Sequence, residues 1–90
     1  MKNEVYVFTG EEAHIPAGIF TTLEKAVEWI KTHSLTGMLS KYPVDTGLYD
    51  WAINENFFTV KKDHQKEAKF IQRFTCASLE HFHFEKGEEI

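Results

Sequence analysis

Tyr42-Pro43-Val44-Asp45-Thr46-Gly47-Leu48-Tyr49-Asp50-Trp51 is the stretch where turn residues, large aromatic side chains and carboxylates lie closest together. Proline stops regular strand pairing, and residues 43–47 have the turn residues of a five-residue connection. The flanking residues 35–42 and 48–53 both have strand-like composition. The sequence therefore predicts a hairpin, with the rest of the chain arranged around it.

The second arm of this hairpin carries the residues that we expect to contact a partner. Successive side chains of a strand point to opposite faces, so Tyr49 and Trp51 would share one face and Asp50 would lie on the other. Tyrosine and tryptophan are frequent interface anchors, although the same side chains also suit a core. Asp45 and Asp50 could act as an acid and base pair, but an aspartate in such a loop is more typical of an Asx-turn.

The other elements follow from the spacing of apolar residues. Strands are expected at residues 4–8, 18–20, 57–60 and 78–85, and helices from Thr21 to about residue 34 and over residues 65–74. Thr21 is expected to cap the first helix, because Glu24 follows it with the spacing of a capping box. The order β-β-α-β-β-β-α-β predicts an α+β fold in which a single antiparallel sheet of about five to six strands carries two helices on one face.

Length and composition indicate one domain. The 90 residues are 42% hydrophobic and 14% aromatic, which is enough for one core and too little for two. We expect residues 1–90 to form this domain, with residues 86–90 as a frayed tail. No signal peptide or membrane span is apparent, so the expected location is the cytoplasm. The single cysteine, Cys76, agrees with a reducing compartment and is read as a small core residue rather than a nucleophile.

Charge favours a protein partner over nucleic acid. The net charge is −4. Residues 61–73 carry five basic and two acidic side chains, a local charge of +3, so the rest of the chain carries −7. Glu11 and Glu12 add to this acidic part, for which a basic protein is the electrostatic complement.

A metal site is the alternative that the sequence leaves open. His81 and His83 would lie on the same side of a strand, a spacing that can hold zinc if His14 or Asp50 supplies a third ligand. No Cys-x-x-Cys or His-Glu-x-x-His motif accompanies the pair. The sequence therefore predicts neither a metal nor another cofactor, and a metal-dependent hydrolase using His81, His83 and Asp50 is the second hypothesis.

The chain also resembles a known kind of protein. Five segments carry the resemblance: 13–20 (AHIPAGIF), 24–30 (EKAVEWI), 35–37 (LTG), 42–51 (YPVDTGLYDW) and 78–81 (SLEH). Together they look like a family of small uncharacterised bacterial domains, which resemble free-standing cytosolic proteins. Small acidic domains of this kind recur as immunity proteins beside polymorphic or contact-dependent toxins. The resemblance implies no catalytic residues.

The leading hypothesis is a non-enzymatic binding module, most concretely an immunity protein that neutralises a basic toxin domain. The expected contact residues are Glu11, Glu12, Asp45, Tyr49, Asp50 and Trp51. A third hypothesis is a ligand-sensing or oligomeric domain in which sheet edges pair two copies as a homodimer. Neither nucleic acid nor a membrane is an expected partner.

Overall fold

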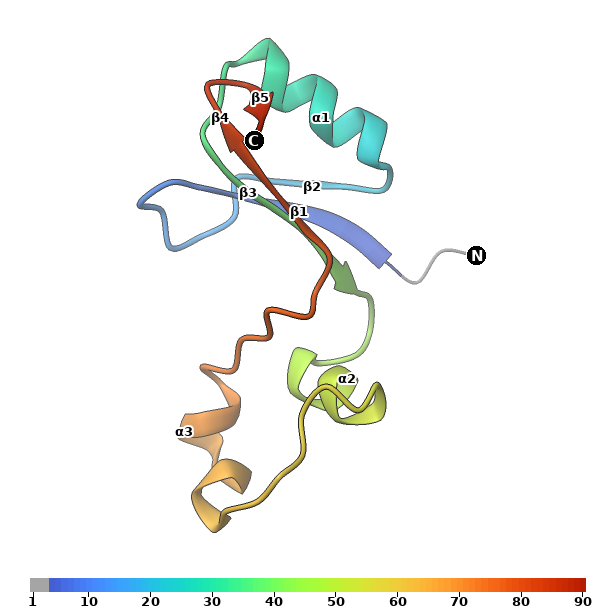
Figure 1. Ribbon diagram of the computed structural model, residues 1–90, viewed down its shortest axis with the longest axis vertical. Helices are drawn as coiled ribbons and strands as arrows, with labels where there is room; N and C mark the ends of the chain where they lie inside the picture. Colours follow the sequence, from blue (N-terminus) through green and yellow to red (C-terminus); the bar gives the residue numbers. More distant parts are fainter. Residues whose placement is uncertain (1–3) are drawn as a thin grey trace.

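A computed structural model describes residues 4–90 of the protein, which form two lobes along the longest axis (Figure 1). We call residues 4–47 and 79–90 the sheet lobe and residues 48–78 the helical lobe. The molecule measures 45 × 32 × 19 Å, and its radius of gyration is 14.5 Å. A compact chain of this length would have a radius of about 12 Å. The elongated shape therefore leaves much of each lobe facing solvent.

The sheet lobe contains one antiparallel sheet in the order β2-β1-β3-β4-β5. The strands are β1 (Glu4–Gly10), β2 (Gly18–Phe20), β3 (Gly37–Pro43), β4 (His81–Glu85) and β5 (Glu88–Glu89). The two main helices are α1 (Leu23–Thr32), which packs on the sheet, and α2 (Leu48–Asn54), which belongs to the helical lobe with a short α3 (Ala68–Ile71) and a 3-10 helix, η1 (Asp63–Lys66). The predicted α+β fold with a single antiparallel sheet is confirmed.

The core of the sheet lobe lies between α1 and one face of the sheet. Ala26 and Ile30 of α1 are fully buried and pack with Phe8, Leu39 and Phe84 from three strands. Apolar residues three and four positions apart place one stripe of the helix against the sheet, as the spacing predicts. Because α1 is the only long helix within residues 4–90, a single layer of core holds the sheet lobe together.

The cap of α1 lies one residue later than the capping-box spacing predicts. The Thr22 hydroxyl accepts a hydrogen bond from the Lys25 backbone N–H at 3.2 Å. We expect Thr22→Ala to lower the free energy of unfolding by about 1 kcal/mol, because one amide of the first turn loses its partner. Thr21→Ala, at the neighbouring exposed threonine, is the matched control and should leave a urea denaturation midpoint unchanged. Equal losses at both positions would contradict this assignment.

The predicted hairpin strand at residues 48–53 is wrong, because this segment is α2. Both edges of β3 are already occupied by β1 and β4, so no edge remains for a hairpin partner. Gly47 in extended conformation precedes the helix, and the Asp50 carboxylate lies in its first turn, where it complements the helix dipole. The fully buried Ala52 fixes the inward side of the helix.

Two further predicted elements are also replaced. Residues 57–60 form no strand; the N–H groups of Phe57 and Phe58 instead donate to the Ala52 carbonyl, at 2.8 and 3.2 Å. The helix expected over residues 65–74 is divided into η1 and α3, which lie in the helical lobe rather than against the sheet (Figure 1). The order β-β-α-β-β-β-α-β is therefore corrected to β-β-α-β-α-η-α-β-β.

The C-terminal segment expected to fray is held by hydrogen bonds. The Gly87 N–H donates to the Leu35 carbonyl at 2.8 Å, and the Ile90 N–H donates to the His83 carbonyl at 2.9 Å. Gly87 has a φ of 86° and packs beside α1, which explains why a glycine stands at this turn. The last residues thereby supply β5, the fifth strand of the sheet.

Candidate functional site

Four of the predicted contact residues surround the start of α2. Asp45 is exposed in the loop before the helix, with a φ of 65°, and Asp50 is exposed in the first turn. Tyr49 is half-buried, and its hydroxyl donates to the Gln65 carbonyl at 2.8 Å. Trp51 is half-buried and packs on Phe57, with ring centroids 5.4 Å apart. The two aromatic side chains therefore help to build the helical lobe, and the two carboxylates remain accessible.

Glu11 and Glu12 lie at the other end of the sheet. Glu4 pairs with Pro43 and Gly10 pairs with Gly37, so the chain reaches Glu11 at the end of β1 that is far from α2. A strand of seven residues spans roughly 20 Å. The six predicted contact residues therefore do not form one continuous surface.

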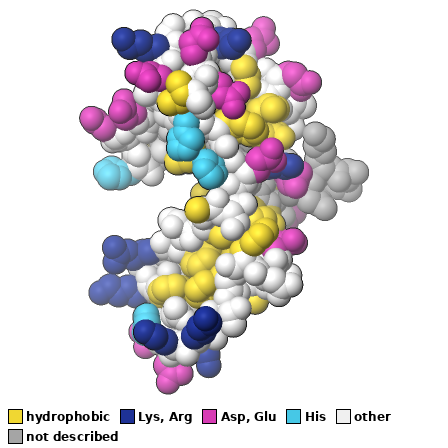
Figure 2. All heavy atoms as spheres, viewed as in Figure 1, with side chains coloured by type: hydrophobic (Ala, Val, Ile, Leu, Met, Phe, Trp, Pro, Cys, Tyr) yellow, Lys and Arg dark blue, Asp and Glu magenta, His cyan; other side chains and the backbone are white. Residues whose placement is uncertain are grey.

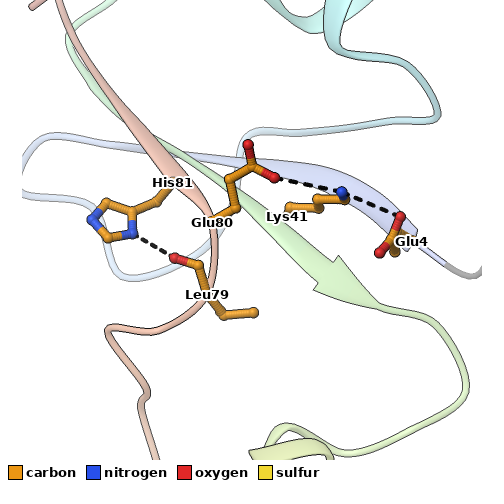
Figure 3. A network of polar contacts seen from close by, with 5 residues as sticks. All are labelled: Glu4, Lys41, Leu79, Glu80 and His81. Carbon is orange, nitrogen blue, oxygen red and sulfur yellow. Dashed lines mark hydrogen bonds and ion pairs between the residues drawn. The ribbon is translucent and has the colours of Figure 1, made fainter. Parts of the chain in front are cut away.

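The two histidines of β4 lie side by side, as the strand alternation predicts. Their ring centroids are 5.3 Å apart, and both residues are exposed. The His81 Nδ1 lies 2.6 Å from the Leu79 carbonyl oxygen, so this nitrogen carries the proton (Figure 3). Asp50 belongs to the helical lobe, and within residues 4–90 no three His, Cys, Asp or Glu side chains are grouped so that they could hold a metal ion.

The sheet has a second face, opposite to α1, that the sequence analysis missed. Phe8 pairs with Leu39, and Leu39 pairs with Phe82, so these side chains point together toward α1. The alternate residues of each strand point away from the helix. We call this second surface the open face; it consists of Val5, Val7, Thr9, Ile19, Met38, Ser40, Tyr42, His81, His83 and Glu85.

The open face carries exposed apolar side chains and two hollows. Ile19 is 65% exposed and Met38 is 39% exposed. One hollow, of about 430 Å³, is lined by Val7, Thr9, His14, Pro16, Ile19 and Tyr42. The other, of about 630 Å³, includes Thr9, Glu11, Met38, His83 and Glu85 in its lining. Thr9 belongs to both, so the two hollows adjoin across β1, and Figure 2 shows histidines beside apolar side chains on the sheet lobe.

A charged network lies near the helical lobe, on the face of the sheet that packs against α1. The Lys41 ammonium lies 3.4 Å from Glu4 and 3.5 Å from Glu80 (Figure 3). Desolvation lowers the pKa of Lys41, but the charge of Glu4 and the hydrogen bonds to Glu4 and Glu80 outweigh it, so the pKa lies above the usual 10.5. The network therefore favours the charged form of Lys41 in the folded state.

A raised pKa predicts a loss of stability in alkali. Because Lys41 binds its proton more tightly in the folded state, its contribution is fully present below pH 10.5 and is lost as the pH rises through the higher folded-state value. We expect Lys41→Met to lower the Tm slightly at neutral pH, with the difference from wild type shrinking above pH 10.5. Circular dichroism melts over a pH series measure this, with the exposed Lys25→Met as control. A difference that stayed constant with pH would rule the network out as its cause.

Comparisons with known proteins give one match. The profile of a family described as domain of unknown function (DUF7710) matches residues 5–90. No curated protein matches the chain. No solved structure matches it. Within residues 4–90, every helix is too short or too polar to cross a bilayer.

Proposed function

The chain belongs to the family described as domain of unknown function DUF7710, and we propose that it is a non-enzymatic protein-binding module whose partner docks on the open face. The observation that carries this proposal is the exposure of Ile19 and Met38 on a sheet face that α1 leaves uncovered. Monomeric proteins rarely leave large contiguous apolar patches in water, and such patches mark interaction sites. The open face combines exposed apolar side chains with polar ones, as protein interfaces do.

Charge indicates what kind of partner binds. The sheet lobe carries ten acidic and four basic side chains, a net charge of −6, whereas the helical lobe carries four acidic and five basic ones, a net charge of +1. Glu11 and Glu85 line a hollow of the open face itself, together with one lysine, Lys86. A basic protein surface would be steered to this lobe and held against the exposed Ile19 and Met38 of the open face. Asp45 and Asp50, near the start of α2, would add to the attraction without touching a partner on the open face.

The proposed partner is a basic bacterial toxin domain, which the chain would neutralise by covering a functional surface. Two features support this: the acidic sheet lobe, and the resemblance to small acidic bacterial domains, a kind that recurs as immunity proteins. The deciding experiment is affinity purification of the tagged chain with the product of the adjacent gene, followed by an assay of that product's toxicity. A neighbour that does not bind, or that stays toxic when bound, would overturn the toxin-neutralising role.

A pair of variants tests whether the open face is the interface. Ile19→Glu places a charge among the exposed apolar side chains of the open face and should weaken partner binding by about 30-fold or more, as loss of a hot-spot residue does. Ile71→Glu makes the same change at a residue of the helical lobe that is 38% exposed, and it should leave binding unchanged. Calorimetric titration measures both affinities. Loss of binding in the Ile71 variant alone would move the interface to the helical lobe.

Self-association is the other possible use of the open face. Sedimentation of the isolated chain distinguishes it from partner binding, because a homodimer through this face would dissociate in the Ile19→Glu variant. The proposed function predicts that the wild type and the Ile19→Glu variant are both monomers. A wild-type dimer that Ile19→Glu converts to a monomer would assign the open face to a second copy of the chain.

A further inference from the structure

The helical lobe is built from aromatic rings that solvent still reaches. Tyr49, Phe58, Phe70 and Phe74 form one cluster, with ring centroids 5.5 Å apart for Tyr49 and Phe74 and 5.1 Å apart for Phe58 and Phe74. None of these four rings is fully buried, and Ala52 is the single buried residue among residues 48–78. Three of these rings, Phe58, Phe70 and Phe74, also form part of the wall of a groove.

This groove has the size and lining of a small-molecule site. Its volume is about 760 Å³, within the range of roughly 300–1,000 Å³ typical of ligand pockets. Four phenylalanines supply its apolar surface: Phe57, Phe58, Phe70 and Phe74. Cys76, the only cysteine of the chain, also lines it and is half-buried.

The charged residues of the groove favour an anion. Lys69 and Arg73 line it against a single carboxylate, Glu67. Figure 2 shows apolar side chains across the helical lobe with Lys and Arg side chains beside them. An arginine guanidinium can donate two parallel hydrogen bonds to a carboxylate, and lysine adds a second positive charge.

We propose that the groove binds a small amphipathic carboxylate, with an alkyl or aromatic body against the phenylalanine rings and the carboxylate at Lys69 and Arg73. The apolar body would remove the exposed part of the rings from water, which is the main source of affinity. The carboxylate would select this ligand over a neutral molecule of the same length. The site lies in the other lobe from the open face, so it is independent of the proposed protein partner.

Cys76 provides a reporter inside the groove. A ligand seated there should shield the thiol, so the rate at which iodoacetamide alkylates Cys76 measures occupancy at this site. Octanoate is the probe and octanol is its neutral counterpart. Ligands of this size reach roughly millimolar affinity. At saturating octanoate we expect alkylation, followed by intact-protein mass spectrometry, to slow by about fivefold or more, and octanol at equal concentration to protect less.

The charge preference is tested with a double variant. Lys69→Gln with Arg73→Gln should raise the octanoate concentration needed for half-maximal protection of Cys76 by about tenfold and leave that of octanol unchanged. Both side chains are exposed, so the fold should survive, which circular dichroism checks. Lys61→Gln with Lys62→Gln, two exposed lysines of the same lobe outside the groove lining, is the charge-matched control and should behave as wild type.

Three results would overturn the proposal. They are no protection of Cys76 by octanoate in the wild type, equal protection by octanol and octanoate, and octanoate protection that persists in the double variant. The measurement also distinguishes the groove from the open face, because Ile19→Glu should leave the protection of Cys76 by octanoate unchanged.

Discussion

Replacing Gly37 by alanine is expected to lower the free energy of unfolding by about 3 kcal/mol or more, because the new methyl group would collide with backbone atoms. A Cβ at this position would meet the Thr9 carbonyl oxygen and would lie 2.8 Å from the Gly10 Cα. It would also lie 2.8 Å from Cζ of Phe8, a fully buried core ring. These atoms belong to β1, the neighbouring strand of the sheet, and cannot move without breaking its pairing with β3.

Gly10→Ala is the matched control, because Gly10 pairs directly with Gly37 across the two strands. The nearest atom to a Cβ at Gly10 is the Thr36 carbonyl oxygen at 3.9 Å, an ordinary van der Waals distance. We expect its effect on the free energy of unfolding to stay below about 1 kcal/mol. Urea denaturation of both variants measures the difference. Similar losses in the two proteins would contradict the register of β1 with β3.

The first helix shows what local sequence can decide. The spacing of Ala26 and Ile30 predicts a helix with one apolar stripe, and the structure buries both residues. The residue that caps this helix could not be predicted from the local sequence in the same way. Thr21 and Thr22 have the same chemistry, and which one caps depends on the direction in which the chain leaves β2.

The segment after Pro43 shows where local pattern fails. Tyr49 and Trp51 alternate as in a strand, but Leu48 and Ala52 are also four residues apart, as in a helix. Over seven residues the two periods cannot be distinguished. The choice is made elsewhere in the chain, because β4 comes from residues 81–85 and occupies the edge of β3 that a hairpin partner would need.

The candidate site was hidden for a related reason. The alternation of β4 correctly predicts that His81 and His83 share a side. It does not reveal that Met38 and Ile19 join them, because the register of β3 with β4 and of β1 with β2 depends on pairing between distant segments. The signal available in the sequence was the predicted arrangement itself. Helices on one face of a single sheet leave the other face to meet solvent or a partner.

Leu39→Ala is expected to lower the free energy of unfolding by about 3 kcal/mol, whereas Met38→Ala should lower it by less than about 1 kcal/mol. The two residues are neighbours on β3, but Leu39 is 0% exposed in the core beneath α1 and Met38 is 39% exposed on the open face. Truncating leucine leaves a cavity among Phe8, Ile30 and Phe84, which are themselves buried. Truncating Met38 removes less buried surface, because its side chain is already partly exposed to solvent.

Partner binding should be weakened more by Met38→Ala than by Leu39→Ala, the reverse of their effects on stability. Met38→Ala removes apolar surface from the open face, so it should weaken binding by about tenfold while the protein stays folded. Leu39→Ala should leave the affinity of the folded fraction nearly unchanged, because its side chain points toward α1. Urea denaturation and calorimetric titration on the same two proteins provide both readouts. If Leu39→Ala weakened binding as much as Met38→Ala at full folding, docking would depend on the whole sheet rather than on its open face.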